Sequence, residues 1–235
     1  MLERFSKSYR VINKEKFVEK LINFSVDQDY FILLNSNNNS DKYDLLCGYG
    51  VKSFIKSSEN SLTKLDNFFE LKKDWLFGYM TYDLRNEIEV LNDDNIDFIN
   101  MPNLYFFQPE IVWFVKGKIV TGLSFEKDLI DNDWKKFNEI SKKDKTKNSS
   151  IVKLNLRNSK NEYINKVNKI KERIFRGDCY EMNFCFDLFS EYDEINPYDT
   201  YVKLNNYTKS PMSSFLKAND LFLISSSPER FLSKN

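Results

Sequence analysis

The sequence predicts an α+β fold, in which helices and strands interleave without the regular alternation of a doubly wound parallel sheet. Two hairpin signals are the first evidence for this class. One joins residues 111–115 and 119–123 around Lys116-Gly117-Lys118, and the other joins residues 214–216 and 221–225. The composition, 41% hydrophobic and 16% aromatic over 235 residues, is sufficient for a large buried core.

Hydrophobic spacing predicts the elements of the first half in order. Asn13 can cap a helix whose apolar residues, from Phe17 to Ile22, recur with the period of an α-helix. The apolar run 30–34 predicts a buried strand, and the polar run 35–40 after it predicts a loop. A strand, a helix and a strand are expected next, at residues 43–47, 62–69 and 75–82. Within the last strand, Gly78 indicates a close approach of two backbones.

A change of composition suggests where the chain divides. Residues 141–150 are Lys, Asn, Ser, Thr, Asp and no apolar type, which is typical of an exposed linker. We therefore expect an N-terminal domain at residues 1–140, a linker at 141–158 and a second domain from 159 to 235. The charged run 126–147 predicts a solvated helix face that leads into the linker.

The second domain is expected to begin with a helix. Ser159 and Glu162 have the spacing of a capping box, and Gly177 is placed to end the helix. Alternation over residues 182–188 predicts a half-buried strand, and Pro197 predicts the start of a short helix. The apolar stripe of the first helix should be buried and consists of Ile164, Val167, Ile170 and Ile174.

Charge and composition exclude several classes of function. Lys plus Arg and Asp plus Glu both number 35, so the chain lacks the excess of positive charge that nucleic acids or anionic membranes require. We expect no partner of either kind. No apolar run reaches the roughly 18 residues of a spanning helix, and the N-terminus has no pattern of a signal peptide. Three cysteines without C-x-x-C spacing indicate free thiols and a cytoplasmic location.

The absence of histidine restricts the chemistry further. Ser-His and Cys-His nucleophiles and His-ligated metal sites cannot form in this chain. The glycine-rich signatures that hold phosphates, G-x-x-x-x-G-K-[ST] and G-x-G-x-x-G, are also absent. Catalysis by this chain would therefore depend on carboxylates or other groups.

Short segments in a fixed order resemble the chorismate-utilising enzymes. Residues 176–184 (RGDCYEMNF) resemble the family's G-D-x-Y-Q-x-N segment, with Glu181 where the family commonly has Gln. Residues 225–232 (SSSPERFL) resemble its S-S-P-E-R-F-L segment. Upstream, residues 33–36 (LLNS) and 77–84 (FGYMTYDL) resemble the N-terminal domain of the same family. Together the segments extend over nearly the whole chain.

The resemblance implies a fold and an activity. It implies the layered α/β sandwich of anthranilate synthase component I, incomplete at the C-terminus because family members continue well past the S-P-E-R-F segment. Residues 211–215 (PMSSF) resemble the P-F-S-A-F form of aminodeoxychorismate synthase component I. That enzyme aminates chorismate at C4 to 4-amino-4-deoxychorismate, towards p-aminobenzoate and folate.

The same resemblance implies partners and alternatives. A separate glutamine amidotransferase subunit would supply ammonia, and Mg²⁺ would be held by residues of the missing C-terminal part. We therefore expect the 235-residue chain to be inactive alone. Two alternatives remain: anthranilate synthase component I of tryptophan biosynthesis, and a non-catalytic module that binds tryptophan or the amidotransferase.

Site residues follow from the matched motifs. Glu229 is the expected general acid/base, placed partly buried at a strand end by Pro228; the alternative is a surface ion pair with Arg230 or Lys234. Tyr180 and Asn183 could shape the chorismate pocket, although we favour a role in satisfying buried backbone groups. Four residues resemble the family's tryptophan pocket, with loop capping and ordinary packing as the equal alternative: Ser36, Pro211, Met212 and Ser213.

Overall fold

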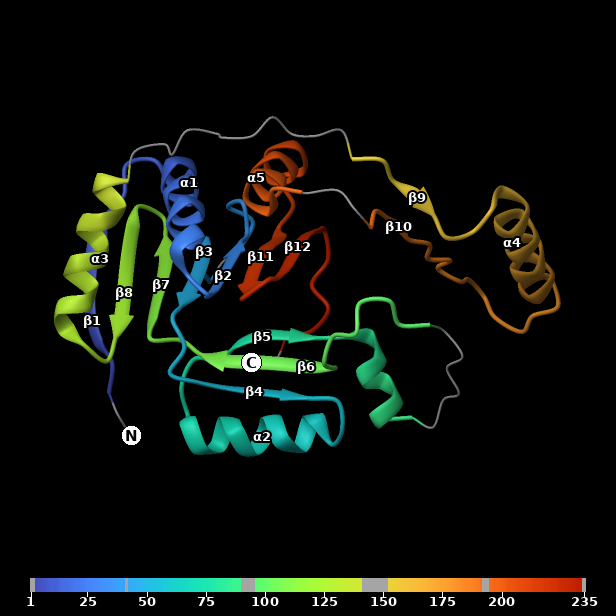
Figure 1. The fold of residues 1–235 in the computed structure, drawn as a ribbon, viewed down its shortest axis with the longest axis horizontal. Helices are drawn as coiled ribbons and strands as arrows, with labels where there is room; N and C mark the ends of the chain where they lie inside the picture. The colour runs from blue at the N-terminus through green and yellow to red at the C-terminus, as the bar shows by residue number, and fades with distance from the viewer. Residues whose placement is uncertain (1–2, 41, 90–95, 141–151, 192–194, 234–235) are drawn as a thin grey trace. The chain divides into compact units, whose positions relative to one another are not determined.

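The computed structural model describes residues 3–40, 42–89, 96–140, 152–191 and 195–233, and its chain divides into two compact units (Figure 1). Unit 1 comprises Met1–Asp144 and Pro197–Asn235, and unit 2 comprises Lys145–Asn196. Helices and antiparallel sheets are mixed along the chain, which confirms the predicted α+β class. In the described part of the chain, no helix is both long and apolar enough to cross a membrane.

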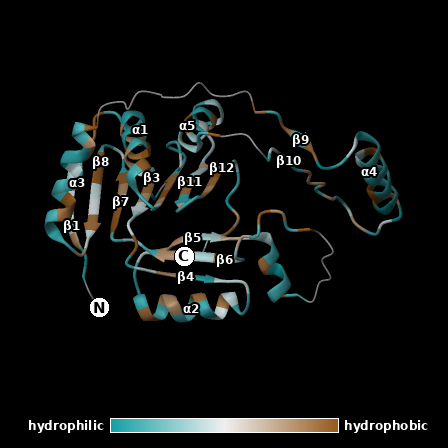
Figure 2. Cartoon of the chain, in the orientation of Figure 1, coloured by the Kyte–Doolittle hydropathy of each residue, from teal (hydrophilic) through white to brown (hydrophobic). Residues whose placement is uncertain are grey.

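A seven-stranded antiparallel sheet forms the centre of unit 1 (Figure 1). Both predicted hairpins are confirmed, as β7/β8 and β11/β12, and Figure 2 shows β7 as hydrophobic along most of its length. The strands, in the order in which they lie side by side, are β1 (Phe5–Arg10), β8 (Ile119–Ser124), β7 (Ile111–Lys116), β3 (Leu45–Tyr49), β2 (Tyr30–Asn35), β11 (Met212–Ala218) and β12 (Leu221–Ser227).

Three helices pack on one face of this sheet. They are α1 (Lys14–Phe24), α3 (Lys127–Glu139) and α5 (Pro197–Thr208). Asn13 caps α1 as expected, since its side chain accepts a hydrogen bond from the backbone N–H of Lys16 at 2.9 Å. The core beneath the helices is aromatic, with Trp113 fully buried against Tyr9 of β1 and two rings of α3, Trp134 and Phe137.

A second, three-stranded sheet covers the other face. Its strands lie in the order β4 (Ser53–Ser57), β6 (Leu104–Gln108) and β5 (Phe77–Met80), and their buried side chains pack against Ile32 and Val112 of the large sheet. Helix α2 (Ser61–Lys72) contacts β4 and β6, and Figure 1 shows it on the side away from the large sheet. The layers of unit 1 are therefore helices, sheet, sheet and helix.

Gly78 lies where two backbones meet, as its position in the strand predicted. A Cβ atom at Gly78 would lie 1.8 Å from the carbonyl oxygen of Tyr105 and 2.7 Å from the Cα of Phe106. We expect Gly78→Ala to lower the free energy of unfolding by about 3 kcal/mol, because β5 and β6 must separate to admit the methyl group. Urea unfolding monitored by tryptophan fluorescence measures this.

Gly117 provides the matched control for that substitution. A Cβ at Gly117 meets nothing within 4 Å, and its φ of +60° is a conformation that Asn adopts readily. The free energy of unfolding of Gly117→Asn should therefore be close to that of the wild type. Equal stabilities of Gly78→Ala and Gly117→Asn would contradict the proposed backbone contact.

Unit 2 consists of helix α4 (Lys160–Phe175) and two short paired strands, β9 (Asn155–Leu156) and β10 (Leu188–Phe189). The capping box of Ser159 and Glu162 is confirmed, with both reciprocal hydrogen bonds present. Gly177 adopts a φ of +81° and ends the helix as expected.

Two predictions for unit 2 are wrong. The stripe of Ile164, Val167, Ile170 and Ile174 is not buried: Ile164 is 42% exposed, and α4 has no buried residue. The predicted strand 182–188 forms a ladder only at Leu188, where Leu156 pairs with it. Both failures have one physical cause, because alternation and helical periodicity bury a face only where a partner surface covers it.

The observed units divide the chain differently from the predicted domains 1–140 and 159–235. Most of the expected linker, residues 141–151, lies outside the described residues, so that boundary stays a prediction. Residues from Pro197 onward belong to unit 1, since β11 pairs with β2 in the large sheet. Pairing between segments so far apart in sequence leaves no local signal in either one.

Candidate functional site

The four residues expected to form a tryptophan pocket come together in unit 1. Ser36 follows the last residue of β2, and Pro211 precedes β11, whose residue Ser213 is paired with Asn35 in the ladder. The Ser36 hydroxyl donates to the backbone carbonyl of Asp44 at 3.0 Å, and its side chain is buried. Met212, the first residue of β11, lies next to them in the strand. Their binding of tryptophan stays a prediction.

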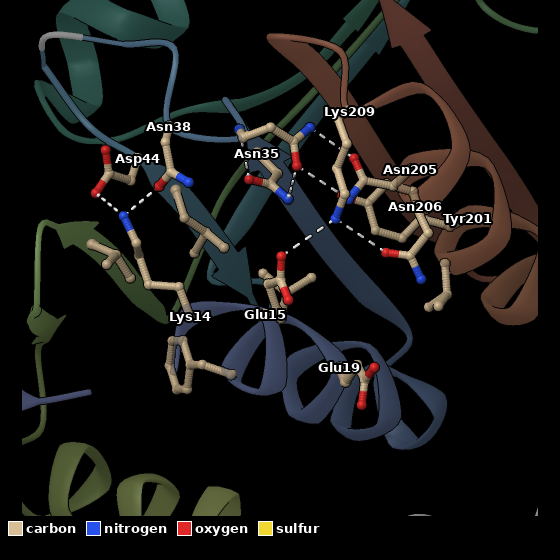
Figure 3. Close-up of a pocket in the computed structure, with 16 residues that line it drawn as sticks. Lys14, Glu15, Glu19, Asn35, Asn38, Asp44, Tyr201, Asn205, Asn206 and Lys209 are labelled. Carbon is tan, nitrogen blue, oxygen red and sulfur yellow. Dashed lines mark hydrogen bonds and ion pairs between the residues drawn. The ribbon is translucent and has the colours of Figure 1, made fainter. Parts of the chain in front are cut away.

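A cavity of about 200 Å³ lies beside this cluster, between α1, α5 and the end of β2 (Figure 3). The four predicted residues do not line it. Its apolar lining consists of Phe17, Val18, Leu45, Val115, Tyr201 and Val202. Its polar lining consists of Lys14, Glu15, Glu19, Asn35, Asn37, Asn38, Asp44, Asn205, Asn206 and Lys209.

Asparagine amides fix one wall of the cavity. The Asn37 side-chain nitrogen donates to the Asn205 side-chain oxygen at 2.9 Å and to the Ser210 carbonyl at 2.7 Å. The Asn35 side-chain oxygen accepts from the backbone N–H of Asn37 at 3.0 Å. Asn35 and Asn205 are 8% and 6% exposed, and buried amides of this kind require such partners. The network ties the loop after β2 to α5.

The backbone around the cavity is also specialised. Asn37, Asn38 and Lys209 have φ angles of +50°, +68° and +49°, in the left-handed region. Asparagine tolerates this conformation and lysine does so less readily. The polar run 35–40 predicted only a loop, and no pattern in the sequence pointed to this site. The asparagine-rich run, together with Asn205-Asn206, is the signal that could have indicated it.

Two lysines pair with carboxylates at the rim of the cavity (Figure 3). Lys14 Nζ lies 2.8 Å from Asp44 Oδ2, which also accepts the backbone N–H of Gly117 at 2.8 Å, so this carboxylate is held from two sides. Lys209 Nζ lies 3.5 Å from Glu15 Oε1 and donates to the Asn206 side chain at 3.3 Å.

Tyr201 closes the cavity on the α5 side and is 1% exposed. Burial raises the pKa of its phenol above the ordinary value, and the hydrogen bonds with Ser213 and Asn35 oppose this effect without cancelling it. The phenol is therefore neutral over the physiological range. The Ser213 hydroxyl lies 3.3 Å from it, which links the predicted pocket residues to this wall.

Glu229 lies beyond the end of β12, and its side chain is exposed. The Ser227 hydroxyl accepts the backbone N–H of Glu229 at 3.2 Å and donates to the Glu229 carbonyl at 3.1 Å, so a compact turn around Pro228 orients this residue. Thr208 of α5 forms a hydroxyl–hydroxyl bond with Ser226.

The expected partial burial of Glu229 is therefore wrong for this chain. The chain leaves the sheet after Ser227, and within the described ranges no element covers the turn. An ion pair of Glu229 with Arg230 is not formed among these residues, and Lys234 lies outside them. The catalytic role of Glu229 remains a prediction.

Tyr180 and Asn183 lie in unit 2, on the segment between α4 and β10. The Tyr180 side chain is 93% exposed, so it satisfies no buried backbone group there, and Asn183 is exposed as well. Nearby, the rings of Phe184 and Phe186 contact Tyr163 of α4 at centroid distances of 5.4 and 5.9 Å. The role of Tyr180 and Asn183 in substrate binding stays a prediction.

The sequence model of the chorismate binding enzyme family matches residues 24–235. The chain belongs to this family. The resemblance found in the motifs is thereby confirmed, and the motif-bearing residues of both units fall within the matched range. Among the described residues, no group of three or more acidic or cysteine side chains is placed to hold a metal ion.

Three curated relatives of this chorismate binding enzyme show modest identity. Aminodeoxychorismate synthase component 1 of Salmonella typhimurium is 24% identical over 157 residues, which are 66% of this chain and 34% of that protein. The Escherichia coli protein of the same name is 28% identical over 74 residues, 32% of this chain and 16% of that protein.

The third relative is an anthranilate synthase component I-like protein of Synechocystis, 27% identical over 171 residues, or 67% of this chain and 33% of that protein. The chain therefore spans about a third, or less, of the length of each of these relatives. Their names support both members of the family that the motifs indicated.

Proposed function

We propose that this chorismate binding enzyme contributes to the amination of chorismate at C4, giving 4-amino-4-deoxychorismate for the synthesis of p-aminobenzoate and folate. The observation that carries the proposal is the family match over residues 24–235 together with two relatives named aminodeoxychorismate synthase component 1. The segment 211–215 at the head of β11 supports the same choice. Anthranilate synthase component I is the alternative, supported by the third relative.

Glu229 is proposed to act as the general acid/base. The C4 hydroxyl of chorismate leaves poorly as hydroxide, so a positioned acid should protonate it during amination. The turn held by Ser227 fixes the backbone that carries the Glu229 carboxylate. A covering wall from outside residues 1–235 would partly bury this carboxylate, which would then face the leaving C4 hydroxyl.

Partners and location belong to the same proposal. A glutamine amidotransferase subunit would supply ammonia, consistent with relatives named as a component 1. The resemblance also implies Mg²⁺, but the described residues offer no ligand set for it, so we assign no step to the metal. We propose that its ligands lie in the C-terminal part of the longer protein.

We also propose a cytoplasmic location. The free thiols of Cys47, Cys179 and Cys185 are consistent with a reducing compartment.

The layers of unit 1 suggest the fold of the whole. We propose that its helix–sheet–sheet–helix arrangement is part of an anthranilate synthase component I-type sandwich. We also propose that residues 159–235 form the first part of the chorismate-binding domain of that fold. The 235 residues alone would then be catalytically inactive.

A direct assay tests the proposed activity. The full-length protein, incubated with chorismate and ammonium ions, should form 4-amino-4-deoxychorismate, identified by mass and retention time, whereas residues 1–235 alone should leave chorismate unchanged. Anthranilate as the product would favour the alternative. Turnover by the isolated 235-residue chain would contradict its proposed inactivity.

Tryptophan binding is the second candidate function, supported by the convergence of Ser36, Pro211, Met212 and Ser213 at the end of β2. We expect calorimetry on the 235-residue chain to detect L-tryptophan binding, and Ser36→Ala to weaken it roughly fivefold, since one hydrogen bond contributes about 1 kcal/mol. If L-tryptophan gives neither binding heat nor a shift in melting temperature with the wild type, the proposed tryptophan pocket is contradicted.

Ser57→Ala is the control for the tryptophan measurement. Ser57 is as buried as Ser36 and likewise donates its hydroxyl to a backbone carbonyl, that of Glu59 at 2.7 Å, but it belongs to β4 in the smaller sheet. An equal loss of binding in both variants would indicate general destabilisation in place of a contact at Ser36.

A further inference from the structure

The cavity between α1 and α5 presents opposite charges from opposite sides (Figure 3). Glu15 and Glu19 project from α1, and Lys209 projects from the end of α5 with the Asn206 amide beside it. Glu15 and Glu19 are one helical turn apart, a spacing at which two carboxylates repel each other. A cation placed between them would relieve this repulsion.

Among the described residues, these charges have one weak ion pair and one carboxylate without an ion-pair partner. Lys209 and Glu15 lie 3.5 Å apart, and their side chains are 47% and 82% exposed, so their pairing contributes little and is easily exchanged. Glu19 is half-buried and has no ion-pair partner among the residues that the structure describes. By contrast, Lys14 is held firmly by Asp44 and Asn38. The exchangeable charges are therefore one ammonium and two carboxylates.

The rest of the cavity is fixed and partly apolar. The buried amides of Asn35 and Asn205 are bonded to the half-buried Asn37 and do not have to rearrange to admit a ligand. Phe17 and Val202 supply apolar surface from the two helices. A volume of about 200 Å³ suits a molecule with a short aliphatic body.

We propose that this cavity binds a small aliphatic α-amino acid as a zwitterion. Its ammonium group lies between Glu15 and Glu19, its carboxylate replaces Glu15 at Lys209, and its side chain covers Phe17 and Val202. The site does not include Ser36, Pro211, Met212 or Ser213, so it is separate from the predicted tryptophan residues. It also does not depend on the proposed amination of chorismate.

Calorimetry with L-leucine on the 235-residue chain tests the site. L-leucine should bind at millimolar concentration, and isoamylamine and isocaproate, which each lack one of its charged groups, should bind at least about tenfold more weakly. Absence of leucine binding, or equal binding of either analogue, would overturn the proposal.

Substitutions at the rim locate the binding. Glu19→Gln removes the ammonium partner, and Lys209→Asn removes the carboxylate partner while keeping a residue that tolerates the left-handed backbone. Each should weaken leucine binding about tenfold, whereas Lys16→Gln on the same helix, outside the lining, and Ser36→Ala should not. Wild-type affinity in both rim variants, with unchanged melting temperatures, would place leucine elsewhere and overturn the assignment.

Discussion

Glu229→Gln should lower the turnover of the full-length enzyme by about 10²- to 10⁴-fold and leave chorismate affinity nearly unchanged. The amide has the same shape as the carboxylic acid but cannot give up a proton to the leaving C4 hydroxyl. The turn that carries residue 229 is built from backbone bonds to the Ser227 hydroxyl, which the substitution does not touch. Steady-state rates and direct chorismate titration separate the two effects.

Glu59→Gln is the matched control for this experiment. Glu59 is an exposed carboxylate of unit 1, in the turn between β4 and α2, where no role in the reaction is proposed. Its variant should keep the wild-type rate. An unchanged rate in Glu229→Gln would show that Glu229 is an ordinary surface residue and would contradict its proposed role as the general acid.

Arg4→Met should lower the free energy of unfolding by about 3–5 kcal/mol, because it leaves a largely buried carboxylate without its cation. The Arg4 guanidinium donates to both carboxylate oxygens of Asp74, at 2.8 and 2.7 Å, and the two side chains are 6% and 13% exposed. It also donates to the carbonyl of Pro109 at 2.6 Å and covers the ring of Phe125. Urea unfolding measures the loss.

Arg10→Met is the control, since Arg10 lies at the exposed end of the same strand, β1. Its effect should stay within about 0.5 kcal/mol. A similar small effect for Arg4→Met would show that the bonds to Asp74 add nothing to the stability of unit 1.

The ion pair of Arg4 and Asp74 also makes the free energy of unfolding depend on pH. Burial raises the pKa of Asp74, but the hydrogen bonds from Arg4, Gln108 and the backbone of Trp75 outweigh it, and the pKa is lowered overall. A lowered folded-state pKa contributes stability that is complete above the unfolded value of about 3.9 and is lost as the pH falls towards the folded value. The difference between wild type and Arg4→Met should therefore shrink below about pH 4.

Local signals in the sequence were sufficient for elements that depend on local interactions. The Asn13 cap, the Ser159 capping box and the two hairpins formed where spacing and turn residues placed them. Strand β3 lies at Leu45–Tyr49, two residues beyond the predicted range 43–47.

Elements that depend on distant partners were not predictable in this way. Strand β1 has a single buried or half-buried residue, Tyr9, and forms because it pairs along the whole of β8. The apolar stripe of α4 has the right period, yet no residue of this helix is buried in the part of unit 2 that the structure describes. Periodicity indicates which face could be buried, and tertiary packing decides whether it is.

The candidate sites show the same difference between what local sequence predicts and what depends on distant partners. Motif resemblance predicted that Ser36 and Ser213 lie close together. The structure places Ser213 in β11 and Ser36 directly after the neighbouring strand β2. The cavity beside them was missed because its lining comes from α1, α5 and the loop after β2, and no single segment carries a motif for it. The environment of Glu229 could not follow from its sequence position, because the chain turns away from the sheet just before it.

The position of the incoming nitrogen tests the central claim most directly. Full-length protein, chorismate and isotope-labelled ammonium should yield a product with the label on C4 of the ring, as nuclear magnetic resonance would report. Label on C2, in anthranilate, would contradict the proposed reaction in favour of its alternative, and chorismate recovered without label would contradict both.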